Sequence, residues 1–287
     1  GMVEDLITEK NKIKIIILNN NEKIYSDAVI LTTGTYLKGM ILRGSKKTSG
    51  GPHGEKPSLY LSDKLKELGF TIQRLKTGTP PRIEKTSIDY TKALIQPGDN
   101  KKLTFSYSEK SYYKLKDQID CHLIYTTKET HEIIKNNLSK SSMYGGFVEG
   151  IGPRYCPSIE DKVNRFRDKE RHQLFVEPEG LDTDEMYIQG MSSSLPEDVQ
   201  RDMLRTIAGM ENVEIMRTGY AIEYDCVDPL ELKGSLEMKK VEGLFSAGQF
   251  NGSSGYEEAA AQGLIAGINA AMKLKGEEPV QVERTNS

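Results

Sequence analysis

The sequence predicts an α/β fold, and two segments carry that prediction. The run Ala28-Val29-Ile30-Leu31 is continuously apolar and leads into a turn at Gly34, as expected for a strand that is buried on both faces. Residues 243–248 form a second short run that ends in glycine; a Gly-rich turn and an Ala-rich stretch over 256–272 follow it, which predicts strand, turn and helix in that order. A chain of 287 residues is long enough for one large or two small domains.

Composition narrows the class of protein. Hydrophobic residues make up 37% of the chain and charged residues 28%, which is typical of globular proteins and argues against long disorder. The apolar runs are too short to span a bilayer, and no secretory signal pattern opens the chain. The net charge of −3 excludes an overall electrostatic attraction to nucleic acid, so any contact with RNA must come from local patches.

The cysteines and histidines show no pairing pattern. Cys121, Cys156 and Cys226 are odd in number and widely spaced, which argues against a disulfide scaffold or a zinc site and favours a cytoplasmic location. The four histidines lack the spacing of metal ligands, so we predict no metal site.

The N-terminal third predicts a hairpin and a helix. Lys12–Leu18 is rich in β-branched residues, residues 19–22 have turn chemistry, and Ile24 resumes the strand. Residues 58–69 predict a helix, because their leucines share one face and Gly69 stands where a C-cap belongs.

Two features predict a break and two later helices. Pro80-Pro81 interrupts the periodicity of residues 74–82, so we place a domain crossover there. Thr126 and Glu129 match a capping box for a helix that runs to about Leu138. A further helix is expected to start at Pro196, and Gly209 is expected to end it.

The Gly-rich turn before residue 256 is a candidate anion site. Backbone N–H groups at a helix start, together with the helix dipole, could hold a phosphate or the polar edge of a flavin. A tight helix–sheet contact that needs glycine only for packing explains the turn equally well, and the sequence leaves both readings open. Ala259, Gly263 and Gly267 recur every four residues, and we expect this stripe to let another backbone approach closely.

Cys156 is the one candidate nucleophile. It lies in the segment GPRYCPS (152–158), where Arg154 could favour a thiolate and the prolines and glycine predict a loop. A thiolate could add to an electron-poor carbon such as C6 of a uracil. An inert buried thiol is the alternative, and it is the expected state of Cys121 and Cys226.

Two stretches of the chain carry basic but no acidic residues. Residues 28–54 contain Lys38, Arg43, Lys46 and Lys47, and residues 68–83 contain Arg74, Lys76 and Arg82. They could form a local phosphate-binding surface. Scattered surface charge is the alternative.

Five long strings occur in an order that resembles one family. They are RLKTGTPPR (74–82), GPRYCPSIEDK (152–162), LFVEPEG (174–180), GYAIEYD (219–225) and AGQFNGSSGYEEAAAQG (247–263). Together they closely resemble the MnmG (GidA) family of flavin-dependent tRNA uridine 5-carboxymethylaminomethyl modification enzymes, over about residues 2 to 275.

The resemblance implies an activity, its cofactors and its partners. Members of the family act with an MnmE-type GTPase to add an aminomethyl-type group to C5 of the wobble uridine of tRNA. FAD is the bound cofactor, NADH reduces it, and methylene-tetrahydrofolate donates the one-carbon unit. The full-length protein is expected to be a cytoplasmic homodimer.

The resemblance also assigns site residues. It implies that Cys156 is a catalytic thiol acting on the uracil. Positions implied to contact FAD are Val3, Ser58, Gly248, Gln249, Asn251 and Gly252. Positions implied to contact NAD are Gly152, Pro153, Arg154, Tyr155, Cys156, Pro157, Ser158, Ile159, Glu160, Asp161, Lys162, Val163, Asn164, Arg165 and Phe166.

The implied fold is a partial FAD-binding Rossmann-like domain of the glutathione-reductase type with an inserted mixed α/β domain. The FAD-binding domain would comprise residues 2–82 and 229–275, residues 83–228 would be the inserted NAD and substrate domain, and residues 276–287 a linker. Family members begin with a Gly-rich dinucleotide turn and a second functional cysteine, and they continue into a helical C-terminal region. The N-terminal turn with its cysteine and the helical C-terminal region are both absent from this sequence. We therefore expect a central fragment that lacks tight FAD binding and turnover.

Three alternatives stay open at this stage. The first is a flavin- or NADH-dependent reductase of a small molecule, although the CxxC pair of a disulfide reductase is missing. The second is a folate-dependent tRNA uracil methyltransferase with a related flavin fold. The third is a non-catalytic RNA- or protein-binding module that depends on the basic stretches.

Overall fold

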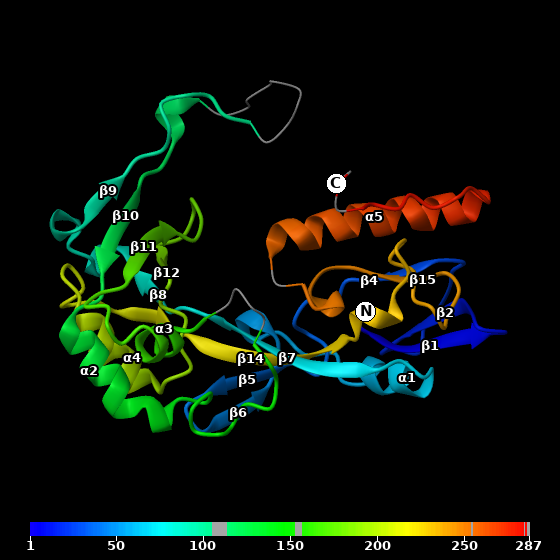
Figure 1. The fold of residues 1–287 in the computed structure, drawn as a ribbon, viewed down its shortest axis with the longest axis horizontal. Coiled ribbons are helices and arrows are strands. Elements are labelled where there is room, and N and C mark those ends of the chain that lie inside the picture. The colour runs from blue at the N-terminus through cyan, green and yellow to red at the C-terminus, as the bar shows by residue number, and fades with distance from the viewer. Residues whose placement is uncertain (105–113, 153–156, 254, 284, 286–287) are drawn as a thin grey trace.

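The computed structural model describes residues 1–104, 114–152, 157–253, 255–283 and 285. Figure 1 shows two lobes that are joined by a central sheet. We call them the sheet lobe, with the six-stranded sheet and helices α2 to α4, and the turn lobe, with both ends of the chain and helices α1 and α5.

The turn lobe contains two small sheets. An antiparallel meander has the order β1 (Val3–Glu9), β2 (Lys12–Leu18) and β3 (Lys23–Tyr25), which confirms the predicted hairpin. A parallel pair joins β4 (Val29–Leu31) to β15 (Leu244–Ser246). Within the described residues β4 has this one neighbour, and Val29 and Ile30 are only half-buried, so the expectation of a strand buried on both faces is wrong for these two residues.

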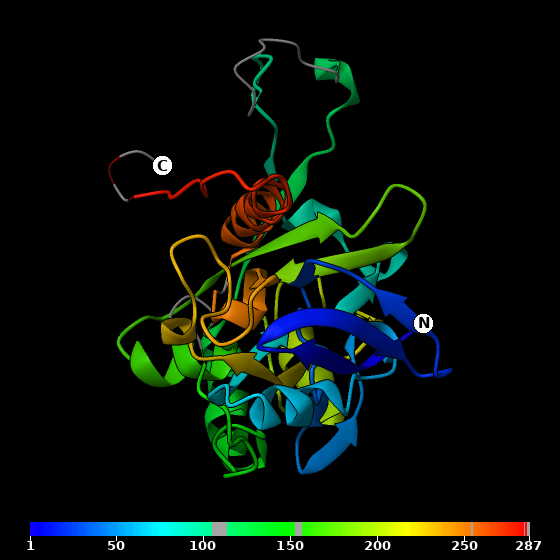
Figure 2. The same cartoon turned by 90° about the vertical axis from the view of Figure 1, so that its right-hand side faces the viewer.

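Two helices cover these small sheets. Helix α1 (Leu61–Glu67) packs against β1 and ends before Gly69, whose φ of +86° fits the predicted C-cap. Helix α5 (Tyr256–Lys275) lies over the β4–β15 pair (Figure 2). The segment after α5 folds back along it, because Val280 N donates to Asn269 Oδ1 at 2.7 Å.

The central sheet consists of β6 (Lys46–Ser49), β5 (Met40–Arg43), β14 (Tyr220–Val227) and β7 (Ile72–Thr79), in that order. Strands β7 and β14 are antiparallel and pair along their whole length. Residues 74–79 are therefore regular strand, where the sequence predicted only a break. Pro80 and Pro81 lie directly after β7, and the break is confined to them.

The sheet lobe is built on a six-stranded antiparallel sheet. Its order is β13 (Ile215–Arg217), β8 (Arg82–Glu84), β12 (Glu185–Gln189), β11 (Gln173–Pro178), β10 (Cys121–Tyr125) and β9 (Leu94–Gln96). Helices α2 (Lys128–Asn137), α3 (Ile159–Arg165) and α4 (Glu197–Arg205) share one buried apolar cluster with this sheet. The mixed α/β class predicted from the sequence is confirmed.

Helix boundaries differ slightly from the prediction. The N-cap of α2 is Thr127, whose hydroxyl accepts from Thr130 N at 3.1 Å, so the capping box lies one residue later than expected. Thr126 cannot cap the helix because its hydroxyl contacts the ring of His131 and accepts from His172 N. Helix α4 ends at Arg205, four residues before Gly209.

The glycines of α5 do not pack as predicted. A Cβ built on Gly263 or Gly267 meets no described heavy atom within 4 Å, and the neighbouring Leu264 is 65% exposed. Of the predicted stripe, Ala259 alone makes a close contact, with Gly248. The expectation that the stripe brings another backbone close is therefore wrong for both glycines within the described chain. None of the described helices combines the length and the apolar character that a membrane span requires.

Candidate functional site

A cleft of about 500 Å³ lies where the two lobes meet. The turn lobe contributes mostly small residues, from the loop after β4 and the turn after β15. The sheet lobe and the ends of the central strands contribute larger side chains, among them Arg82, Tyr187 and Tyr220. We call this space the central cleft.

The glycine turn after β15 is held in place by α5. Gly248 and Gly252 have φ values of +78° and +81°, which favour glycine. Gln262 Oε1 accepts from Gly248 N and from Asn251 Nδ2, both at 3.0 Å. The turn therefore has a fixed shape, and Gln249 on it lines the central cleft.

Several polar atoms around this turn lack a protein partner. Thr33 Oγ1, Ser246 Oγ and Asn251 Oδ1 are buried and make no hydrogen bond within the described part of the chain. Buried polar atoms are nearly always satisfied in folded proteins, so such a group of orphans is compatible with a polar ligand. These three residues do not line the central cleft themselves, but Thr32, Thr35, Gly248 and Gln249 do, and hydroxyl, amide and glycine backbone groups fit the polar edge of a flavin nucleotide.

The opposite wall is aromatic and basic. Arg82 lies 4.7 Å from the ring centroid of Tyr187, and its Nε donates to Glu179 at 3.0 Å. Burial raises the pKa of both Tyr187 and Tyr220. Tyrosine is already protonated at neutral pH, so both phenols can donate hydrogen bonds. A planar ligand in the cleft would have hydrogen-bond donors on this side.

Cys156, Pro153, Arg154 and Tyr155 lie outside the described residues. The segment before them is held against the central sheet. Glu223 Oε1 accepts from Glu149 N at 2.5 Å and from Gly150 N at 2.6 Å, and Lys76 N donates to Ile151 O at 3.0 Å.

The segment after them is anchored in the sheet lobe. Ser158 caps α3 by accepting from Asp161 N at 3.1 Å, and Asp161 Oδ2 accepts from Ser158 N. Glu160 is fully buried, and its Oε1 accepts from Ser194 N at 3.0 Å. Burial raises the pKa of Glu160. Both acidic residues thus make structural contacts within the lobe.

The structure brings together only part of the predicted site. Gly248 and Gln249 line the central cleft, and Asn251 and Gly252 belong to the same turn. Val3 packs into the core of the turn lobe, and Ser58 forms a bridge with Leu37; neither lines the central cleft.

Of the described members of the predicted NAD segment, Ser158 lines a small space that shares Thr77, Gly78, Ser192 and Tyr220 with the central cleft. Gly152 is packed against Lys76, whereas Pro157, Ser158 and Ile159–Arg165 form α3 and its start, with Phe166 as its C-cap. None of them lines the cleft. Sequence reasoning missed Tyr187, which no local motif marks, and Gln262, which is recognisable only as a polar residue on the face of α5 next to the turn.

The other two cysteines are poor nucleophiles. Cys226 is 1% exposed, and burial with Asp225 and Asp228 nearby raises its pKa to about 12. Burial and the carboxylates of Glu177 and Asp120 raise the pKa of Cys121 as well. Among the described residues, no group of three or more His, Cys, Asp or Glu side chains could hold a metal ion.

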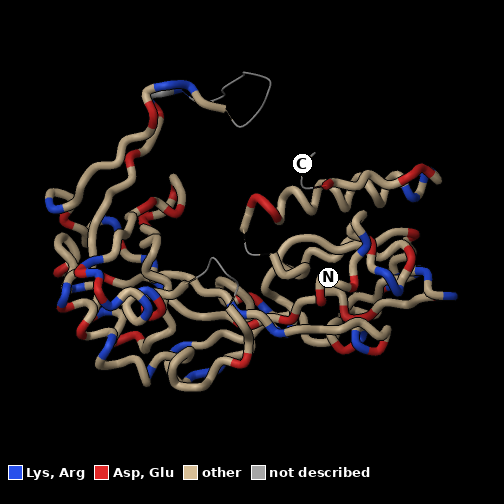
Figure 3. The backbone as a smooth tube through the Cα atoms, in the orientation of Figure 1, with Lys and Arg blue, Asp and Glu red and all other residues tan. Residues whose placement is uncertain are grey.

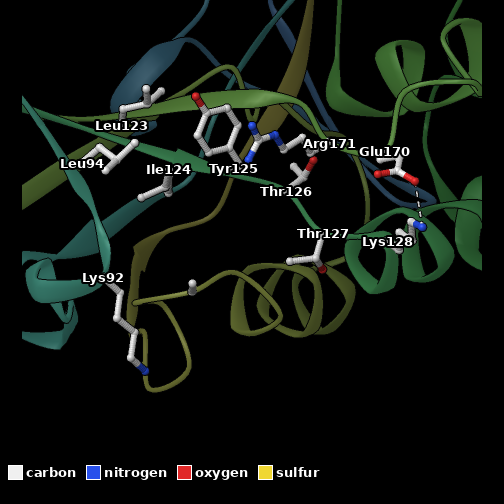
Figure 4. Close-up of a pocket in the computed structure, with 11 residues that line it drawn as sticks. Lys92, Leu94, Leu123, Ile124, Tyr125, Thr126, Thr127, Lys128, Glu170 and Arg171 are labelled. Atoms are coloured by element: carbon white, nitrogen blue, oxygen red, sulfur yellow. Dashed lines mark ion pairs between the residues drawn. The ribbon is translucent and has the colours of Figure 1, made fainter.

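A second cleft, of about 390 Å³, lies beside the start of α2 (Figure 4). Arg171 stacks over Tyr125 with 4.0 Å between the guanidinium carbon and the ring centroid, and Lys128 pairs with Glu170 at 2.9 Å. It shares no lining residue with the central cleft. We call it the lateral cleft. Its residues can serve as control positions for substitutions in other clefts.

Comparison with known proteins gives a consistent result. The family model of glucose inhibited division protein A matches residues 1–278. A protein of Bacillus licheniformis named tRNA uridine 5-carboxymethylaminomethyl modification enzyme MnmG is 56% identical over 287 residues, which are 100% of this chain and 45% of that protein. A protein of Streptococcus sanguinis with the same name is 53% identical over 285 residues, covering 99% of this chain and 45% of that protein.

A solved structure agrees with these relatives. The structure of Aquifex aeolicus GidA in the form I crystal superposes with a TM-score of 0.91 at 50% identity, covering 99% of this chain and 48% of that one. The likeness confirms the predicted fold class. The chain spans about half the length of the relatives it matches.

Proposed function

The chain belongs to the glucose inhibited division protein A family, and from this premise we propose that the full-length protein is a flavin-dependent enzyme that modifies tRNA uridine. The finer proposal is that it adds a carboxymethylaminomethyl-type group to C5 of the wobble uridine. NADH as reductant, methylene-tetrahydrofolate as carbon donor, an MnmE-type GTPase as partner, a homodimer and a cytoplasmic location are parts of the same proposal.

The central cleft is the observation that carries this proposal. FAD bound there would supply the redox chemistry. Gly248 and Gln249 would hold its polar edge through the turn. Tyr187 and Tyr220 would donate hydrogen bonds from the other wall, while Arg82 would offset negative charge that develops on a ligand.

Cys156 is the proposed nucleophile. Its thiolate would add to C6 of the uracil, which makes C5 nucleophilic toward the incoming carbon unit; loss of the C5 proton and elimination of the thiolate would then restore the C5–C6 double bond. The competing thiols are disfavoured, since the pKa is raised at both Cys121 and Cys226. Glu223 and Ser158 would hold the two ends of the segment that carries Cys156.

The test uses the full-length protein. We expect a flavin absorption spectrum in the purified enzyme, and Cys156→Ala should keep that spectrum while wobble modification, measured by mass spectrometry of digested tRNA, falls below detection. Cys121→Ala is the matched control and should retain modification. A well-folded full-length protein without bound flavin would defeat the cofactor proposal, and normal modification by Cys156→Ala would remove the nucleophile.

The prediction for the isolated chain can be tested separately. Residues 1–287 alone should bind FAD weakly, because family members hold the pyrophosphate with a Gly-rich turn that this sequence lacks. Titration of the chain with FAD by fluorescence quenching measures this directly, and tight binding by the chain alone would show that the turn after β15 is sufficient.

A further inference from the structure

The two basic stretches that lack acidic residues meet in one place. A cleft of about 520 Å³ is lined by Arg43 from the first stretch, Arg82 from the second and Arg217 from β13. Among its lining residues Glu197 is the one carboxylate. We call this space the arginine cleft.

The arginine cleft opens beside the proposed active site. It shares His53, Arg82 and Tyr220 with the central cleft, so these three residues form the wall between the two spaces. Acidic and basic residues are intermixed over both lobes (Figure 3), so the cleft is a local concentration of positive charge and not part of a wide basic face.

Two of the arginines bring like charges together on neighbouring strands. Arg82 and Arg217 are directly opposite each other on β8 and β13, and like charges in opposite positions destabilise a sheet. Each of these two arginines forms an ion pair with a glutamate, which reduces the repulsion between them. Arg82 Nε lies 3.0 Å from Glu179, and Arg217 Nε lies 2.8 Å from Glu185.

Arg43 is the least engaged of the three. Its Nη1 is 3.8 Å from Glu197 Oε2, and its Nε is buried without a hydrogen-bond partner within the described chain. The side chains of Arg43 and Arg217 are 37% and 48% exposed, so both can reach a ligand. The pair of Arg43 with Glu197 is exposed, worth little and readily exchanged for a phosphate, to which arginine binds in a bidentate manner, whereas Arg217 keeps its pair with the nearly buried Glu185 through Nε.

The lining also suits a nucleotide. Met216 is 48% exposed and lines the same cleft, so it offers an apolar surface to a base. We propose that the arginine cleft binds the phosphodiester backbone of the RNA strand that enters the central cleft, with Arg43 and Arg217 as phosphate contacts. This inference rests on the proposed function, since it takes tRNA as the substrate.

Binding of a labelled, unmodified anticodon stem–loop RNA to the full-length protein tests the proposal. Arg43→Gln and Arg217→Gln should each weaken binding about tenfold at low salt and should each lower the slope of log K against log salt by about 0.7. Arg171→Gln in the lateral cleft is the matched control and should change neither value.

A gain-of-affinity variant separates this effect from misfolding. Glu197→Gln removes the one carboxylate that lines the arginine cleft, and it should tighten RNA binding and steepen the salt dependence. Unchanged RNA affinity in both Arg43→Gln and Glu197→Gln would overturn the proposal. A loss of NADH affinity instead of RNA affinity in Arg43→Gln would assign the cleft to a dinucleotide and would also overturn it.

The flavin spectrum keeps the two proposals apart. All these variants should retain it, because Arg43, Arg217 and Glu197 do not line the central cleft. If the parent protein binds no flavin but the arginine variants still lose RNA affinity, the proposed function fails while the RNA site stands.

Discussion

The sheet lobe and the turn lobe are packed differently. The buried apolar side chains of the sheet lobe form one continuous cluster, to which the six-stranded sheet and all three of its helices contribute. Those of the turn lobe fall into two clusters, and the one beneath α5 is small, built around Phe245 and alanines. The glycine turn of the central cleft thus lies next to the smallest of these clusters, the one beneath α5.

The different packing suggests that the two lobes differ in stability and in how much a bound ligand stabilises them. The apolar cluster that buries the three helices of the sheet lobe is made by residues of that lobe. In the turn lobe, α5 leaves Leu264 and Leu274 more than half exposed. We infer that the sheet lobe is the more stable unit and that the turn lobe gains more from a bound ligand, because binding to the folded state adds to its stability.

The largest expected effect comes from truncating the core of the sheet lobe. Ile134 on α2 is fully buried in its cluster, so Ile134→Ala should reduce the free energy of unfolding of this lobe by about 2–5 kcal/mol. Leu65→Ala, at an equally buried position in the turn lobe, is the matched control.

Chemical denaturation monitored by hydrogen exchange in peptides of each lobe distinguishes the two. If the lobes are separate units, each substitution should lower protection in its own lobe alone. A single transition that both substitutions shift equally would show that the chain unfolds as one unit, and the comparison of the lobes would lose its basis.

Acid should weaken the sheet lobe specifically. Burial, with the charge of His172 as a second cause, lowers the pKa of His131, and burial also lowers that of His172. The hydroxyl of Thr126 accepts from His172 N at 2.7 Å, so its proton is free to bond His131 Nε2 at 2.8 Å, an arrangement that suits a neutral ring.

The sign of the pH effect follows from these shifts. Below the unfolded pKa of about 6.5 the unfolded histidines bind protons that the folded ones do not, so stability falls as pH drops from 7 toward the lowered folded pKa. Denaturation midpoints of the sheet lobe should therefore fall between pH 7 and pH 5, by less than the fall caused by Ile134→Ala. His131→Gln should make the midpoint less dependent on pH. A midpoint that is flat over this range would contradict neutral burial of these rings.

The sequence predicted what local chemistry decides. The hairpin at Lys12–Leu18 follows from an asparagine-rich turn, and Gly69 and Gly248 occupy positions of positive φ where glycine is favoured. The glycine turn that contains Gly248 and Gln249 is visible in the sequence alone, but their contact with FAD is implied only by the family resemblance.

The features that the sequence did not reveal depend on contacts between residues far apart in the chain. Strand β7 was missed because its partner β14 follows far along the chain and because charged residues break its pattern. Arg74 is held by Asp225 at 2.9 Å, a cross-strand ion pair that hydrophobic periodicity cannot reveal. Tyr187 reaches the central cleft, and Arg217 the arginine cleft, only through the order of the strands in the six-stranded sheet.

The smallest expected effect concerns the exposed face of α5. Glycine within a helix costs about 1 kcal/mol relative to alanine, and a Cβ on Gly263 meets nothing within 4 Å. Gly263→Ala should therefore stabilise the turn lobe of residues 1–287 by up to about 1 kcal/mol. Gly248→Ala is the contrasting control and should destabilise it, because Gly248 has φ +78° and its Cβ would lie 3.4 Å from that of Ala259.

The same substitution in the full-length protein sharpens the comparison between the lobes. If the face of α5 stays open there, Gly263→Ala should again be stabilising, and thermal midpoints of the short and long chains should shift in the same direction. If another part of the longer protein packs on that face, the added methyl group must displace it, and the sign of the shift reverses only in the long chain. A reversal would mean that the small cluster beneath α5 reflects contacts made only in the longer chain, whereas two positive shifts would make the sparse packing of α5 a property of the lobe itself.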